Sequence, residues 1–162
     1  MTELKANLQW NLHCDFSQPQ GELYSQFMSA LKDKIFLGTK IGEKSYFPVK
    51  QFCSTTYQEP EKVLESDGFG VVESFTIYNK KPSRVAFPGA DIAVEAPYIV
   101  AAISVHNSSQ SFFHFLSGVD IDNPLAILES IKAGLEVRPV WAENRQGNIL
   151  DILYFEPVSS SN

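Results

Sequence analysis

Apolar residues near the amino terminus recur at helical spacing. Leu23, Phe27 and Leu31 are spaced four positions apart, which places them on one face of an amphipathic helix. Ser17 is a suitable N-cap for this helix, because its hydroxyl can accept a hydrogen bond from the first turn. The pattern therefore predicts a helix from about Gln20 to Leu37.

Beyond residue 67, short runs of β-branched and aromatic residues alternate with turn-forming residues. Such runs predict buried strands, and the polar turn between the second and third runs favours a β-hairpin. Between the third and fourth runs, Pro124 suits the first position of a short helix and Gly134 suits its end. The expected strands are Val71–Tyr78, Tyr98–Val105, Ser111–Leu116, Leu135–Ala142 and Ile149–Phe155, and the expected helix is Pro124–Ala133.

This order of elements favours a particular fold. Three strands, a helix and two more strands are typical of the five-stranded OB barrel, and a β-sandwich is the alternative. We therefore expect a mainly β protein with an N-terminal helix. The fold alone does not identify what such a barrel binds.

The segment between the helix and the barrel has the layout of a metal-binding knuckle. Gly38, Gly42 and the triplet Tyr46-Phe47-Pro48 predict two extended pieces joined by tight turns, and the polar segment Gln58–Asp67 is expected to be a linker. We accordingly divide the chain into an arm and helix (1–37), a small degenerate ribbon-like lobe (38–67), the barrel (68–158) and a disordered tail (159–162).

Composition and charge exclude several classes of function. The chain has 162 residues, a formal net charge of −6 and no basic stripe, which argues against a nucleic-acid partner. No apolar run approaches the roughly 18 residues that a membrane span requires, and the first residues lack the apolar core of a signal peptide. We expect a cytoplasmic protein.

Candidate reactive side chains are few. Cys14 and Cys53 do not form a Cys-x-x-Cys pair, and a disulfide between them is not expected in a cytoplasmic protein. Cys53 could be a reactive thiol or a metal ligand, although a small buried residue is the favoured interpretation. His114, among phenylalanines, could face a ligand, although a satisfied strand histidine is favoured.

Taken together, the motifs resemble those of a known family of OB-fold, acyl-CoA-associated proteins. Its members carry an N-terminal helix, a rubredoxin-like zinc ribbon and a C-terminal OB barrel, and the resemblance covers roughly Phe16 to Val158. The matching segments are Tyr24–Leu37, Tyr46–Pro48, Gly68–Thr76, Ala96–Ala101, Gly134–Val137 and Tyr154–Val158.

The ribbon departs from the family pattern. Two Cys-x-x-Cys pairs supply four zinc ligands in members that bind metal, whereas the corresponding positions here are about Thr39, Gly42, Cys53 and Thr56. One retained cysteine cannot hold a structural zinc ion, so we expect no metal. Packing should hold the lobe instead, through Phe36, Ile41, Tyr46, Phe47 and Phe52.

The resemblance implies an accessory role rather than catalysis. Similar proteins are partners of thiolase-like enzymes, including lipid-transfer-type proteins, so we expect a subunit that docks on such an enzyme and assists acyl-CoA binding, with no cofactor of its own. The alternative is a free-standing module that binds acyl-CoA or another small molecule. Expected ligand residues are Phe75, Arg84, Tyr98 and His114, and expected docking surfaces are the barrel edges and the helix face of Tyr24, Phe27 and Met28.

Overall fold

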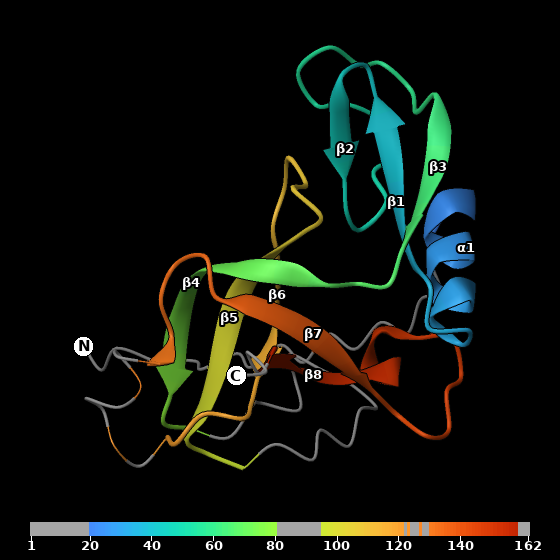
Figure 1. Ribbon diagram of the computed structural model, residues 1–162. Helices are drawn as coiled ribbons and strands as arrows, with labels where there is room; N and C mark the ends of the chain where they lie inside the picture. The colour runs from blue at the N-terminus through green and yellow to red at the C-terminus, as the bar shows by residue number, and fades with distance from the viewer. Residues whose placement is uncertain (1–19, 81–94, 122, 124–126, 128–129, 159–162) are drawn as a thin grey trace, which may run out of the picture.

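A computed structural model describes residues 20–80, 95–121, 123, 127 and 130–158. It contains helix α1 (Glu22–Leu31), a three-stranded sheet and a closed barrel, with the sheet above the barrel and α1 beside both (Figure 1). The sheet consists of β1 (Phe36–Ile41), β2 (Lys44–Tyr46) and β3 (Lys62–Ser66). The barrel consists of β4 (Gly70–Tyr78), β5 (Tyr98–Val105), β6 (Phe112–Leu116), β7 (Glu136–Trp141) and β8 (Ile152–Pro157).

Helix α1 is shorter than the sequence predicted. It ends at Leu31, and the chain turns through Lys34, whose φ of 61° lies in the left-handed region. The backbone N–H of Ile35 donates to the carbonyl of Ala30 at 3.1 Å, and that of Lys34 donates to Leu31 at the same distance. This pair of bonds is a Schellman-type ending with lysine where glycine is usual. The predicted cap Ser17 lies outside the described residues.

The lobe sheet contains a strand that the sequence did not predict. The order is β2-β1-β3, and β3 pairs antiparallel with β1 from Phe36↔Ser66 to Lys40↔Lys62. The expectation that Gln58–Asp67 is only a linker was therefore wrong. Most β3 side chains are exposed, so this edge strand is fixed mainly by backbone pairing and lacks a clear apolar alternation.

The five barrel strands close in the order β4-β5-β6-β8-β7, which confirms the OB-type fold. The last expected strand begins later than predicted, at Ile152, because residues Ile149–Asp151 form a 3-10 turn, η1. The helix expected at Pro124–Ala133 lies partly outside the described residues. Within it, Ile127 is helical, and the N–H of Ile131 donates to its carbonyl at 2.8 Å.

One cluster of buried side chains joins the helix, the lobe and the barrel. Phe36 lies at its centre, fully buried, with ring centroids 5.2 Å from both Phe27 of α1 and Phe112 of β6, and 6.4 Å from Phe47 of the lobe. The lobe therefore shares its core with the rest of the protein. The boundaries between the units of the chain remain a prediction.

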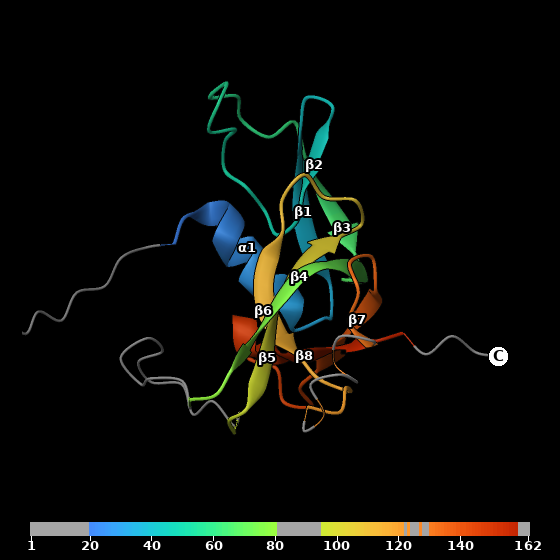
Figure 2. The ribbon, with the colours of Figure 1, turned by 90° about the vertical axis from the view of Figure 1, so that its left-hand side faces the viewer.

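The β5–β6 loop binds the lobe directly. The loop rises from the barrel beside β2 (Figures 1 and 2). The N–H of Ser109 donates to the carbonyl of Ser45 at 2.7 Å, and the N–H of Phe47 donates to the Ser108 hydroxyl at 2.9 Å. Gln110 Nε2 donates to the carbonyl of Pro48 at 2.6 Å. The lobe is thus attached to the barrel both through the chain and through this loop.

A buried carboxylate organises the turn before β8. Asp151 is 2% exposed, and its oxygens accept hydrogen bonds from the backbone N–H groups of Gln146 at 2.9 Å, Gly147 at 2.7 Å and Asn148 at 3.3 Å. Next to them, Arg145 Nε donates to the carbonyl of Lys32 at 2.6 Å, just beyond the end of α1. The turn therefore connects the barrel to the helix.

We expect Asp151→Ala to lower the free energy of unfolding by about 2 kcal/mol, because three backbone donors lose a charged acceptor. Urea denaturation followed by circular dichroism measures this change. Asp33→Ala, which removes an exposed carboxylate, is the matched control and should stay within about 0.5 kcal/mol of the wild type. Equal effects of the two substitutions would contradict the role assigned to Asp151.

Candidate functional site

Two of the positions that the family pattern assigns to zinc ligands, Thr39 and Gly42, make hydrogen bonds within the lobe. Thr39 is fully buried, and its hydroxyl accepts from the N–H of Lys50 at 3.0 Å and donates to the carbonyl of the same residue at 3.1 Å. Gly42 has no side chain to offer, and its N–H donates to Glu61. Within the described ranges, no group of three or more His, Cys, Asp or Glu side chains is placed to hold a metal ion. The residues present do not fit a structural zinc ion.

Packing anchors the lobe through most of the residues that the sequence indicated. Phe36, Ile41, Tyr46 and Phe47 are buried, as expected. Phe52 is not: its side chain is 49% exposed, so its assignment as an anchor was wrong. Val49, which was not among the expected anchors, is 1% exposed and belongs to the core cluster.

Cys53 is a partly exposed thiol, not the small buried residue that was expected. Hydrogen bonds from the Thr56 side chain, from the Thr56 and Thr55 backbone and from the Tyr46 hydroxyl lower its pKa from 9.0 to about 6, against the opposing effect of burial. Such donors stabilise the thiolate, which is the reactive form of cysteine. Cys14, with which no disulfide was expected, lies outside the described residues.

Cys53 should therefore react with iodoacetamide at lower pH than an ordinary thiol. In a Cys14→Ser background, we expect the alkylation rate to be half-maximal near pH 6 and to level off above it, because the thiolate is then fully formed. Thr56→Val should move the midpoint upward. A rate that is still rising steeply above pH 8 would show that the hydrogen bonds do not hold the thiolate.

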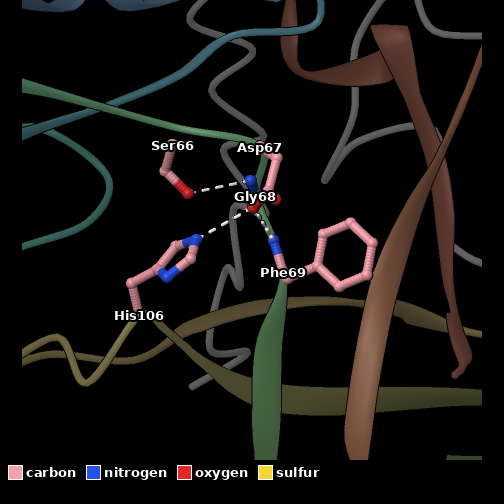
Figure 3. A network of polar contacts seen from close by, with 5 residues as sticks. All are labelled: Ser66, Asp67, Gly68, Phe69 and His106. Carbon is pink, nitrogen blue, oxygen red and sulfur yellow. Dashed lines mark hydrogen bonds and ion pairs between the residues drawn. The ribbon is translucent and has the colours of Figure 1, made fainter.

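A polar network connects the lobe to the barrel (Figure 3). His106 Nε2 lies 2.8 Å from Asp67 Oδ1, which also accepts from the N–H of Phe69 at 3.1 Å. The Ser66 hydroxyl accepts from the N–H of Gly68 at 2.9 Å. Partial burial tends to raise the pKa of Asp67, but the hydrogen bonds that Asp67 accepts from His106 and from the backbone of Phe69 outweigh burial and hold this pKa below its ordinary value. The network fixes the turn that enters β4.

Two of the expected ligand residues share the interior face of the barrel. Phe75 pairs across the sheet with Ala101, which pairs with His114, and residues in such a row project from the same face. Ala101 is fully buried, so this face is the interior. Phe75 packs, half-buried, against the core cluster.

His114 is a buried histidine with an unsatisfied nitrogen. Its ring lies 5.6 Å from Phe155 and 6.1 Å from Phe112, and Nδ1 has no hydrogen-bond partner in the part of the chain that the structure describes. Burial lowers the pKa of His114 to about 4, although hydrogen bonds to the backbone of Ile149 and Phe115 oppose this shift. The imidazole is therefore neutral at neutral pH.

Tyr98 lies on the opposite, outer face of the barrel. It pairs with Tyr78 of β4, the two rings are stacked at 5.2 Å, and Phe115 meets Tyr98 edge-on at 5.6 Å. Burial, and then the neighbouring Tyr78, raise the pKa of Tyr98. The structure thus separates Tyr98 from Phe75 and His114, and Arg84 lies outside the described residues.

A pocket adjoins this outer aromatic cluster, which we define as Tyr78, Tyr98 and Phe115. It has a volume of about 300 Å³ and lies where β5 begins and β6 ends, with Tyr98, Phe115 and Leu153 in its wall and Glu95 and Ser117 as polar groups. Sequence reasoning did not find Tyr78 or Phe115. Residues two apart in a strand lie on the same face, so the sequence gives the faces within one strand. Which residues of neighbouring strands meet on that face depends on the pairing register, which the sequence does not give.

The helix face expected to dock a partner is largely occupied by the protein itself. Phe27 is 1% exposed and packs edge-on against Phe36, and Met28 is half-buried against the same cluster. Only Tyr24, at 38% exposure, presents substantial surface. The expectation that Phe27 is free for docking was wrong, because the helix uses its apolar face to attach to the lobe and barrel.

The architecture defines an OB-fold protein with a ribbon-like lobe that lacks a metal site among its described residues. In comparisons with known proteins, no family model and no curated protein matches the chain. Solved structures do. An Ltp2-ChsH2(DUF35) aldolase aligns with a TM-score of 0.54 and 18% identity, covering 86% of this chain and 98% of that chain.

A second similar structure comes from Sulfolobus solfataricus. It is a DUF35 family protein of unknown function, with a TM-score of 0.50 and 19% identity, covering 74% of this chain and 78% of that chain. The fold is thus the one seen in DUF35 proteins, which confirms the resemblance stated from the sequence motifs at the level of fold. No helix among the described residues has the length and hydrophobicity needed to cross a bilayer.

Proposed function

We propose that this protein is a non-catalytic accessory subunit that docks on a thiolase-superfamily enzyme and assists the binding of acyl-CoA. The observation that supports this most is the fold, which matches nearly the whole of a chain from an Ltp2-ChsH2(DUF35) aldolase. The name of that protein couples a DUF35 chain to Ltp2. The proposal extends such a partnership to this chain.

The outer face of the barrel is the surface best suited to a partner. On it, Phe113 is 75% exposed, and Tyr78 of the outer aromatic cluster is 47% exposed. Exposed aromatic side chains of this size are enriched at protein interfaces. A protein subunit covering this face would remove them from water.

The acyl group is proposed to bind outside the barrel rather than within it. The interior is filled by side chains that include Ile103 and Phe155, both fully buried, so no acyl chain fits there without displacing the core. The pocket beside Tyr98 offers an apolar wall at the barrel surface. Arg84 remains the proposed cation for the CoA phosphates. The chain itself makes and breaks no bond; it shapes the site.

Native mass spectrometry of the protein purified from its own cells tests the partnership. We expect a complex with a subunit that peptide sequencing identifies as a thiolase-superfamily enzyme. Phe113→Glu should remove this subunit, whereas Val63→Glu, an equivalent change at a 41% exposed position on β3, should retain it. A lone monomer in the wild-type preparation would refute docking.

Calorimetric titration with octanoyl-CoA tests the acyl-CoA role. We expect the assembled complex to bind it more tightly than the enzyme alone does, and Tyr98→Ala or Arg84→Ala to weaken binding about tenfold by removing apolar contact or a charged hydrogen bond. A free-standing binding module is the second candidate, favoured by the pocket. If the protein is such a free-standing module, the isolated chain should bind octanoyl-CoA as tightly as the complex does.

A further inference from the structure

A second surface depression is lined by residues from the N-terminal end of α1 and from the loop that joins β2 to β3. Figure 2 shows α1 and this loop. The depression shares no lining residue with the pocket beside the outer aromatic cluster. Its volume is about 470 Å³. Leu23 of α1 and Pro60 of the loop give it apolar walls, and Phe52 and Tyr57 line it as well. We call it the tip groove.

The two aromatic rings of the tip groove are held outward by the backbone. Phe52 and Tyr57 stack with an interplanar angle of 13° and are 49% and 79% exposed. Tyr57 has a φ of 58°, a conformation that bulky residues rarely adopt. Two bonds fix it: the N–H of Tyr57 donates to the carbonyl of Cys53 at 2.7 Å, and the N–H of Cys53 donates to that of Gln58 at 2.9 Å. The loop thus presents an aromatic face to solvent at a conformational cost.

The charged side chains that line the tip groove are both acidic. Glu22 and Glu59 line it from opposite sides, one on α1 and one on the loop, and no lysine or arginine does so among the described residues. Glu22 accepts a hydrogen bond from Gln26 at 3.3 Å. Glu59 makes no hydrogen bond or ion pair with any residue that the structure describes. An exposed aromatic face flanked by two carboxylates is complementary to a cation with a flat apolar surface.

We propose that the tip groove docks an arginine-bearing segment of a protein partner. The guanidinium stacks on Tyr57 and pairs with Glu59 or Glu22, while a neighbouring apolar side chain of the segment lies against Leu23 and Pro60. Arginine fits better than lysine because its planar group both stacks on a ring and donates to carboxylates. This inference does not depend on the accessory role proposed above, since the groove is separate from the outer face of the barrel.

The test uses a defined probe, so it needs no knowledge of the partner. Acetyl-Leu-Arg-amide is titrated into the full-length protein, and the ring resonances of Phe52 and Tyr57 are followed by NMR. We expect saturable shifts, and binding of the otherwise matched acetyl-Leu-citrulline-amide about tenfold weaker, because citrulline keeps the shape and loses the charge. Raising the salt concentration should weaken only the arginine probe.

Matched variants locate the effect. Tyr57→Leu keeps apolar bulk and removes the aromatic face, and Glu59→Gln removes one charge; each should weaken the arginine probe several-fold. Glu65→Gln, at an exposed position on β3, should leave binding unchanged. Unchanged circular dichroism spectra verify folding of each variant. Equal binding of the arginine and citrulline probes, or shifts that survive Tyr57→Leu together with Glu59→Gln, would overturn the proposal.

Discussion

Replacing Phe36 by alanine should lower the free energy of unfolding by about 3–5 kcal/mol. The reason is the position of the ring: it is fully buried and contacts aromatic side chains of the helix, the barrel and the lobe at once. A neighbouring ring that moved into the cavity left by this substitution would lose its contacts with its own part of the protein. Because small proteins have about 5–15 kcal/mol of stability in total, the variant should be close to unfolding at 37 °C.

Chemical denaturation with two signals measures this effect. Phe113→Ala removes the same type of side chain from barrel strand β6 at a position that is 75% exposed, and it should cost less than about 1 kcal/mol. Circular dichroism reports the sheets, and tryptophan fluorescence in a Trp10→Phe background reports Trp141, which packs against the core cluster. A Phe36→Ala protein as stable as Phe113→Ala would mean that the ring does not join the three parts.

Acid should destabilise the wild-type protein through His114 by about 3 kcal/mol between pH 6.5 and about pH 4. The unfolded chain protonates this histidine below its ordinary pKa of 6.5, whereas the folded protein resists protonation until about pH 4. Protons are therefore bound preferentially by the unfolded state throughout this window, and stability falls with pH. Above pH 6.5 both states are neutral and the histidine contributes no pH dependence.

His114→Leu is the variant that isolates this contribution. Leucine fills the apolar site and cannot be protonated. It gives up the hydrogen bonds to the backbone of Ile149 and Phe115, which should cost about 1–2 kcal/mol at every pH, whereas Nδ1 has no partner among the described residues to lose. The difference in unfolding free energy between the two proteins should change with pH only between about pH 4 and 6.5. A constant difference over that range would contradict a buried neutral imidazole.

The sequence was sufficient to predict the bounds of a strand where a continuous apolar run coincides with a buried strand. Tyr98–Val105 was predicted with the boundaries that β5 has, because both faces of this strand are largely covered and the run is continuous. The polar strand β3 was missed for the opposite reason: its side chains are mostly exposed, and only its pairing with β1 defines it. The end of α1 was missed because lysine stands where glycine would signal a stop.

The candidate ligand residues show the limit of reasoning without register. Phe75, Tyr98 and His114 come from neighbouring strands, and composition alone placed them together. The pairing of β4, β5 and β6 sends Phe75 and His114 inward and Tyr98 outward. A shift of one residue in any strand would have reversed its assignment. The partners of Cys53 were likewise hidden, since they depend on how the loop folds back onto Thr56 and Tyr46.

The shared core also bears on how this protein could have evolved. A ribbon clipped by a metal ion carries its own source of folding energy and can be moved from one protein to another as a module. This lobe buries Phe47 and Val49 in the same cluster as barrel residues, and the β5–β6 loop supplies hydrogen bonds to its backbone. Because barrel side chains and the β5–β6 loop stabilise the lobe, we expect the lobe not to fold when it is transferred to another protein without the barrel.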